Sequence, residues 1–153
     1  MRLLIAATVS LAICLISIPP AWADRAGPSR PDPALTPGKV ATTDVREVCA
    51  TEDNLSYSRR HRATSHELKS WVFREYGIEP PQGYARTEWE IDHRIPLCLG
   101  GADEAANLWP QNRTTFPKKD RLEAHACREV CAGRLSLVEA QGWFLGDWTA
   151  AQN

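Results

Sequence analysis

Two adjacent side chains, Asp92 and His93, have the types needed for metal-assisted hydrolysis. A carboxylate can hold a divalent cation, and an imidazole that titrates near neutrality can take a proton from water. Neighbours on a strand point to opposite faces, so both can act on one atom only at a bulge or a strand end. Pro96, three residues after His93, indicates such an irregularity. A surface Asp–His pair without a catalytic role is the alternative.

A β-hairpin is predicted to carry these two residues. Apolar residues at odd positions predict a first strand with one face on a core: Ile91, Ile95, Leu97 and Leu99. Gly100-Gly101 and Asp103 predict the turn, because glycine accepts a positive φ. Asn107 opens a short return strand through Leu108 and Trp109, which Pro110 ends or restricts to an edge.

From residue 92 to 111 the chain reads Asp-His-x-Ile-Pro-Leu-x-Leu-Gly-Gly-x-Asp-x-x-x-Asn-Leu-Trp-Pro-Gln, which resembles the HNH (ββα-metal) endonuclease motif. The chain is similar to small exported bacterial HNH-like proteins over roughly residues 45–150, with the motif itself inside about 89–125. This resemblance implies an α+β fold with a ββα-metal hairpin-plus-helix core, flanking helices and disulfide staples.

The resemblance also implies roles for the motif residues. Asp92 is expected to bind the metal, His93 to act as general base, and Asn107 to bind backbone or orient His93. The expected cofactor is a divalent ion, Mg²⁺ first because hard cations prefer carboxylate oxygen, with Mn²⁺ or Zn²⁺ as alternatives. The family's third residue, a His or Asn near the start of the last helix, has no counterpart at Thr115-Phe116. The nearest candidates are Asn112, Asp120 and Glu123, whereas His125 lies about two turns too late.

Nucleic acid, most simply DNA, is the expected substrate of a monomeric protein. The basic residues expected to contact it are Arg94, Arg113, Lys119 and Arg121, with further positive charge at Arg59, Arg60, Arg62 and Lys118. No base-reading element is evident, so an exported HNH endonuclease with little sequence specificity is predicted. The alternative is a catalytically degenerate HNH-fold module that binds nucleic acid or an envelope partner.

Residues 1–23 resemble a secretory signal peptide, with Arg2, an apolar run and the cleavage motif Ala21-Trp22-Ala23. An uncleaved anchor is the alternative; after cleavage no transmembrane span is expected, and the protein is predicted to be periplasmic or secreted. The remaining chain has 17 Lys and Arg against 19 Asp and Glu, a net charge of −2. This net negative charge argues against strong sequence-independent binding to nucleic acid.

Cleavage would leave four of the five cysteines, which in an exported chain indicates two disulfides. Cys127 and Cys131 are one helical turn apart and do not readily bond to each other. The family resemblance implies Cys49–Cys131, which leaves Cys98–Cys127; a zinc site with four cysteine ligands is the alternative.

Residues 24–41 are rich in proline and are expected to form a disordered linker before one HNH nuclease-like domain, residues 42–153. Five predictions concern the elements around the hairpin. Residues 42–50 form a short helix with Val45 and Val48 inward, and 54–62 form a loop. A capping box at 64–67 opens a helix with Leu68, Trp71, Val72 and Tyr76 in the core, ended by Gly77. Helices over 118–132 and from Ser136 onward bury Leu122, Ala126, Val130, Leu137, Ala140, Phe144 and Trp148.

Overall fold

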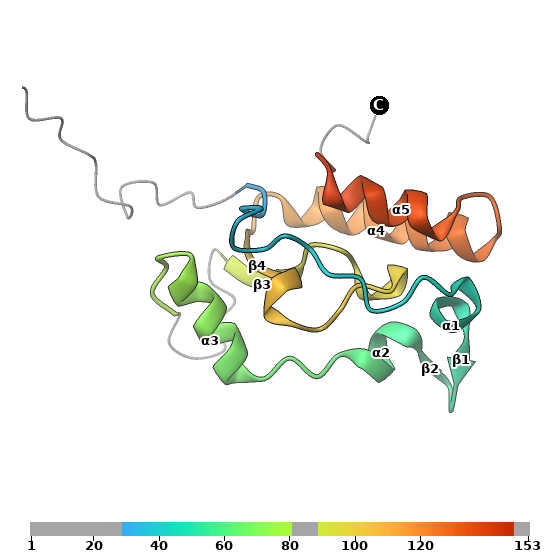
Figure 1. Ribbon diagram of the computed structural model, residues 1–153, viewed down its shortest axis with the longest axis horizontal. Coiled ribbons are helices and arrows are strands. Elements are labelled where there is room, and N and C mark those ends of the chain that lie inside the picture. Colours follow the sequence, from blue (N-terminus) through green and yellow to red (C-terminus); the bar gives the residue numbers. More distant parts are fainter. Residues whose placement is uncertain (1–28, 81–88, 149–153) are drawn as a thin grey trace, which may run out of the picture.

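A computed structural model describes residues 29–80 and 89–148 of the chain. Within these residues the fold is α+β, with five α-helices and two antiparallel two-stranded sheets (Figure 1). The elements in chain order are α1 (Val45–Cys49), β1 (Thr51–Glu52), β2 (Leu55–Ser56), α2 (Tyr57–His61), α3 (His66–Glu75), β3 (Trp89–His93), β4 (Leu108–Asn112), α4 (Phe116–Cys131) and α5 (Leu137–Leu145). No helix in the described ranges is long and apolar enough to cross a membrane. The predicted signal peptide, residues 1–23, lies outside them.

The predicted hairpin is formed by β3 and β4, whose antiparallel register pairs Asp92 with Trp109 and His93 with Leu108. The first strand is shorter than the alternating pattern predicts, because it ends at His93 and Leu97–Leu99 form a 3₁₀ turn. Pro96 has no N–H for a strand ladder, and both backbone groups of Ile95 bond to the Asn107 side chain instead.

One face of the hairpin meets α4, which lies beside α5 (Figure 1). The apolar residues predicted for these two helices are buried: Leu122, Ala126, Val130, Leu137, Ala140, Phe144 and Trp148. Trp148 lies beyond the end of α5 at Leu145, and not within the helix as predicted. The Ser136 hydroxyl caps α5 by accepting the Glu139 N–H, and Pro117 lies in the first turn of α4, where its missing N–H costs nothing. Helix α4 therefore packs against this face of the hairpin.

The opposite side of the hairpin meets α3, which contacts both β3 and β4. The N-cap of α3 is Ser65, which accepts the Leu68 N–H, one residue after Thr64, the cap that the capping box at 64–67 predicts. Val72 is buried, but Trp71 is 45% exposed, so its predicted place in the core is wrong. Phe73 is buried instead. Trp71 and Val72 are adjacent on a helix, 100° apart, so a single apolar stripe does not hold both equally.

Two expectations about the chain before α3 are corrected. Residues 54–62 are not a loop, since β2 and then α2 form there and Tyr57 is buried. In α1, Asp44 accepts the Arg46 N–H as the cap and Val48 is buried, but Val45 is 42% exposed. A five-residue helix buries only one face, which Val48 occupies.

The described part of the expected linker, residues 29–41, is attached to the hairpin. Thr36 is fully buried, and its hydroxyl donates to the Leu108 carbonyl at 2.8 Å. Val40 forms an isolated bridge with Gly101, and the Gly38 N–H donates to the Ala106 carbonyl. Backbone hydrogen bonds order this stretch although its prolines and glycines bury little apolar surface.

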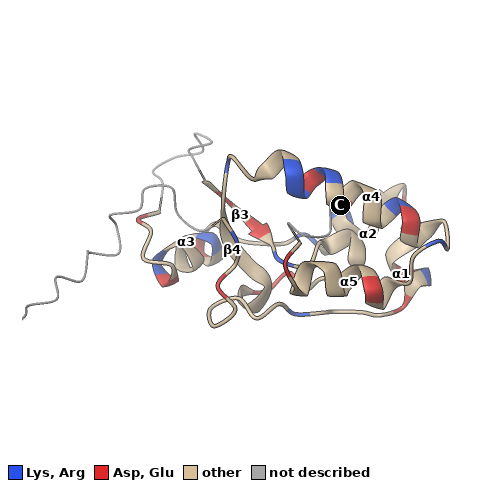
Figure 2. Ribbon diagram, turned by 90° about the horizontal axis from the view of Figure 1, so that it is seen from above, with Lys and Arg blue, Asp and Glu red and all other residues tan. Residues whose placement is uncertain are grey.

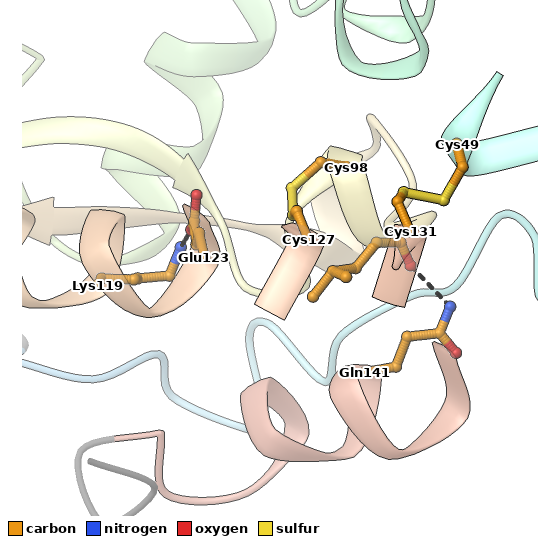
Figure 3. Close-up of a disulfide and its surroundings, with 8 residues drawn as sticks. Cys49, Cys98, Lys119, Glu123, Cys127, Cys131 and Gln141 are labelled. Carbon is orange, nitrogen blue, oxygen red and sulfur yellow. Dashed lines mark hydrogen bonds and ion pairs between the residues drawn. A yellow bond between two sulfur atoms is a disulfide. The ribbon is translucent and has the colours of Figure 1, made fainter. Parts of the chain in front are cut away.

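Two disulfides join distant segments to α4, with the pairing that the family resemblance implies (Figure 3). Cys49–Cys131 links the end of α1 to the end of α4 over 82 residues. Cys98–Cys127 links the 3₁₀ turn after β3 to α4 over 29 residues. The four-cysteine zinc site is excluded, because disulfide sulfurs are not thiolate ligands.

Candidate functional site

Asp92 and His93 point to opposite faces of β3, as strand geometry requires. The Asp92 carboxylate faces α4, where it accepts a hydrogen bond from the Lys119 ammonium at 2.6 Å. The His93 ring faces the other way, and its Nε2 lies 2.7 Å from Asp103 Oδ1. The structure therefore does not bring the two predicted catalytic side chains onto one atom.

His93 belongs to a buried polar cluster that joins the hairpin to the start of α3. Its residue is 2% exposed, and the Asp103 carboxylate that it contacts also accepts from the Thr64 hydroxyl and the Ala63 N–H. Burial lowers the pKa of His93 below its usual 6.5 although both neighbouring carboxylates oppose that shift. The imidazole is accordingly neutral at pH 7.

Asp103 has the opposite balance. Burial would raise the pKa of its carboxyl, but the hydrogen bonds from Thr64, Ala63 and His93 lower it below 3.8. Asp103 therefore stays ionised and fixes the His93 ring. It is absent from the predicted site residues although it lies inside the motif; the signal available was a carboxylate in the hairpin turn, ten residues after the histidine.

The other face is centred on Lys119, which was expected to contact substrate. Its side chain is fully buried, and its ammonium donates to Asp92 Oδ2, to the His93 carbonyl at 2.8 Å and to Glu123 Oε1. Burial alone would lower the pKa of Lys119, but the Asp92 and Glu123 carboxylates raise it above 10.5, so the group is a permanent cation. Figure 3 shows Lys119 and Glu123 on the same stretch of α4.

Asn107 is fully buried, and its side chain hydrogen-bonds to backbone groups, which is one of its two expected roles. Its Oδ1 accepts the Ile95 N–H, and its Nδ2 donates to the carbonyls of Ile95 and Ala102, each at 2.9 Å. The turn beneath it requires Gly101, where a Cβ would lie 1.9 Å from the Ile95 oxygen. Asn107 thus holds the hairpin closed, and none of its hydrogen bonds reaches the His93 ring.

The four predicted substrate contacts divide into two groups. Lys119 is internal, and Arg94 is also wrong as a contact: it is 8% exposed and donates to the backbone carbonyls of Thr36, Phe144 and Leu145. Arg113 and Arg121 are exposed. Arginine can satisfy several carbonyls at once, and Arg94 uses that capacity to attach the segment before α1 to the end of α5.

The residues around Asp92 do not fit a resident divalent ion. Its carboxylate already holds an ammonium, and the described ranges contain no group of three His, Cys, Asp or Glu side chains placed to share a metal. Among the candidates for the third motif residue, Glu123 is the one that shares a partner with Asp92, because both carboxylates bind the Lys119 ammonium. Asn112 hydrogen-bonds Thr114 instead, and His125 stacks on Trp143.

Comparison with protein-family models, with curated proteins and with solved structures finds no match for this chain.

Proposed function

We propose that the protein is an exported, disulfide-stapled module with an HNH-like hairpin and helix that binds nucleic acid without using a metal ion. The two disulfides support export, because such bonds persist in oxidising compartments. The buried ammonium of Lys119 supports the loss of metal chemistry, because it takes up the carboxylate that the HNH resemblance assigns to the ion. The proposed activity therefore depends on the outer surface of α4.

The observation that carries nucleic-acid binding is a basic stripe on the exposed side of α4. It consists of Lys118, Arg121, His125 and Arg128, all exposed. Spacings of three, four and three residues place them on one face of the helix. Basic segments along α4 are visible in Figure 2. Glu129, the acidic residue next to Arg128, forms an ion pair with Arg134 at 2.6 Å.

The dimensions of the basic stripe suit a polyanion. Ten residues of α-helix span about 15 Å. Duplex DNA carries one negative charge per about 1.7 Å of its axis, so roughly nine phosphate charges lie within that length. Because the net charge of the chain after residue 23 is negative, binding by this surface should be local and strongly salt-dependent.

The test is a salt titration of binding to a fluorescent 20-base-pair duplex and to the corresponding single strand, followed by anisotropy. We expect binding at about 50 mM salt that weakens as salt increases. The double variant R121A/R128A should reduce the slope of log K against log salt by about 1.8, since each phosphate contact contributes about 0.9.

The matched control is K69A/R74A, which removes two exposed cations from α3 instead of α4. It should leave the slope unchanged. Absence of binding by the unaltered protein at 50 mM salt would overturn the proposal, as would equal slopes for the two double variants.

A second candidate is the metal-dependent nuclease, which one observation favours: the neutral His93 imidazole oriented by Asp103 has the electronic state of a general base. Hydrolysis by this route requires the Lys119 ammonium to leave Asp92. Plasmid nicking in Mg²⁺ or Mn²⁺ that H93Q abolishes, with an unchanged circular-dichroism spectrum, would establish this candidate. Equal nicking by both proteins would exclude it.

A further inference from the structure

The Lys119 ammonium lies in a pocket of oxygen atoms contributed by two elements. β3 supplies Asp92 Oδ2 at 2.6 Å and the His93 carbonyl at 2.8 Å, and α4 supplies Glu123 Oε1. An ammonium has three N–H donors, and these three acceptors use all of them. An all-oxygen set with two carboxylates is also the ligand type that hard divalent cations take.

The charges in this pocket do not balance above about pH 7, where Glu123 is ionised. One ammonium faces two carboxylates, and the Asp92 and Glu123 side chains are only 18% and 22% exposed. Asp120 also lies close enough for the Asp92 carboxylate, together with burial, to raise the pKa of Asp120. The single positive charge of Lys119 offsets only one of the two carboxylates. A divalent cation would offset both.

A further polar atom on the same hairpin face lacks a partner among the described residues. Gln111 is fully buried, its Nε2 donates to the Thr115 hydroxyl, and its Oε1 accepts no hydrogen bond. The register pairs Gln111 with Glu90 and Trp109 with Asp92, so Gln111 lies two pairs along the ladder, on the same face as Asp92. Neutral amide oxygens are ordinary ligands of hard cations.

We propose that Lys119 is the built-in occupant of a cation site formed by Asp92, Glu123 and the His93 carbonyl, and that this site takes a hard divalent ion once the ammonium is removed. The native protein then needs no metal, because a side chain of its own supplies the positive charge. Three protein oxygens and several waters complete the coordination that Mg²⁺ or Mn²⁺ requires.

The test compares Mn²⁺ binding by calorimetry in three proteins. Lys119→Ala removes the ammonium and opens space, whereas Lys119→Met removes the charge but fills the space. We expect Lys119→Ala to bind Mn²⁺ at least tenfold more tightly than either the unaltered protein or Lys119→Met. Adding Asp92→Asn to Lys119→Ala should abolish the gain, and Mn²⁺ should raise the melting temperature of Lys119→Ala alone.

A second variant covers the case in which Lys119→Ala does not fold without metal, because removal of Lys119 leaves two partly buried carboxylates facing each other. This variant is Lys119→Gln, since its amide occupies part of the space and its oxygen can join the site. The proposal is overturned if neither variant gains Mn²⁺ affinity, or if the gain survives Asp92→Asn. Nucleic acid enters none of these measurements, so their outcome is independent of the proposed function.

Discussion

Glu123→Gln should make the protein more stable at alkaline pH and little different at acid pH. Burial is the main cause that raises the pKa of Glu123 from 4.5 to about 7, and the charge of Asp92 adds to it, against the attraction of Lys119. A carboxyl whose pKa is raised on folding stabilises the fold fully below pH 4.5, and this stabilisation is lost as pH rises through 7. Glutamine has the shape of the protonated acid at every pH, so the variant does not lose it.

The expected size follows from the two pKa values. A shift of one unit corresponds to about 1.4 kcal/mol, so the full effect is about 3 kcal/mol. Between pH 5 and pH 8, integration of the two titrations gives a gain of about 2.5 kcal/mol for the variant over the unaltered protein. His93 acts in the other direction, because its lowered pKa reduces stability as pH falls below 6.5. That contribution is common to both proteins and cancels in the difference.

The assay is urea unfolding at pH 5, 6, 7 and 8 with the disulfides intact, followed by tryptophan fluorescence. The control is Glu67→Gln: the pKa of this exposed residue is lowered, chiefly by a hydrogen bond from its own backbone amide, so its effect should fall on the acid side of pH 5. A difference between Glu123→Gln and the unaltered protein that stays flat from pH 5 to 8, or that favours the unaltered protein at pH 8, would refute the reasoning.

The remaining predictions concern the hairpin turn and the disulfides. Asn107→Ala should cost about 3 kcal/mol or more in the free energy of unfolding, because it leaves three buried backbone groups without partners; no loss in a urea titration would contradict this. Replacing each disulfide by two alanines should cost about 3.6 kcal/mol for Cys98–Cys127 and about 4.5 for Cys49–Cys131, since the loops span 29 and 82 residues. If removing the shorter loop proves the more damaging in melting experiments, chain entropy is not the main cause.

Local signals in the sequence predict much of this fold. Ser136 caps the helix that it is predicted to open, and the cap of α3, Ser65, lies within one residue of the predicted position. The left-handed Gly77 and Gly133 follow the helices that they end. The buried face of α4 also follows its apolar spacing. These features depend on a few neighbouring residues, so a short window of sequence contains the physics that determines them.

Features that depend on partners distant in sequence were predicted poorly. From its residue type alone, Lys119 is expected to be exposed. Only the approach of Asp92 from β3 explains why it is buried. Arg94 likewise gains its partners from both ends of the described chain, at Thr36 and Leu145. Long basic side chains are rarely internal unless they are paired, and pairing across more than twenty residues has no local signature.

The arrangement of the disulfides has a consequence for resistance to proteolysis. Cys49–Cys131 encloses Cys98–Cys127 in the sequence, so one backbone cut anywhere between residues 49 and 131 leaves two fragments that are still covalently joined. A nicked molecule would migrate as a single species in a denaturing gel until a reductant is added, and would then separate into two. A single cut in this range therefore does not release any part of the hairpin from α4.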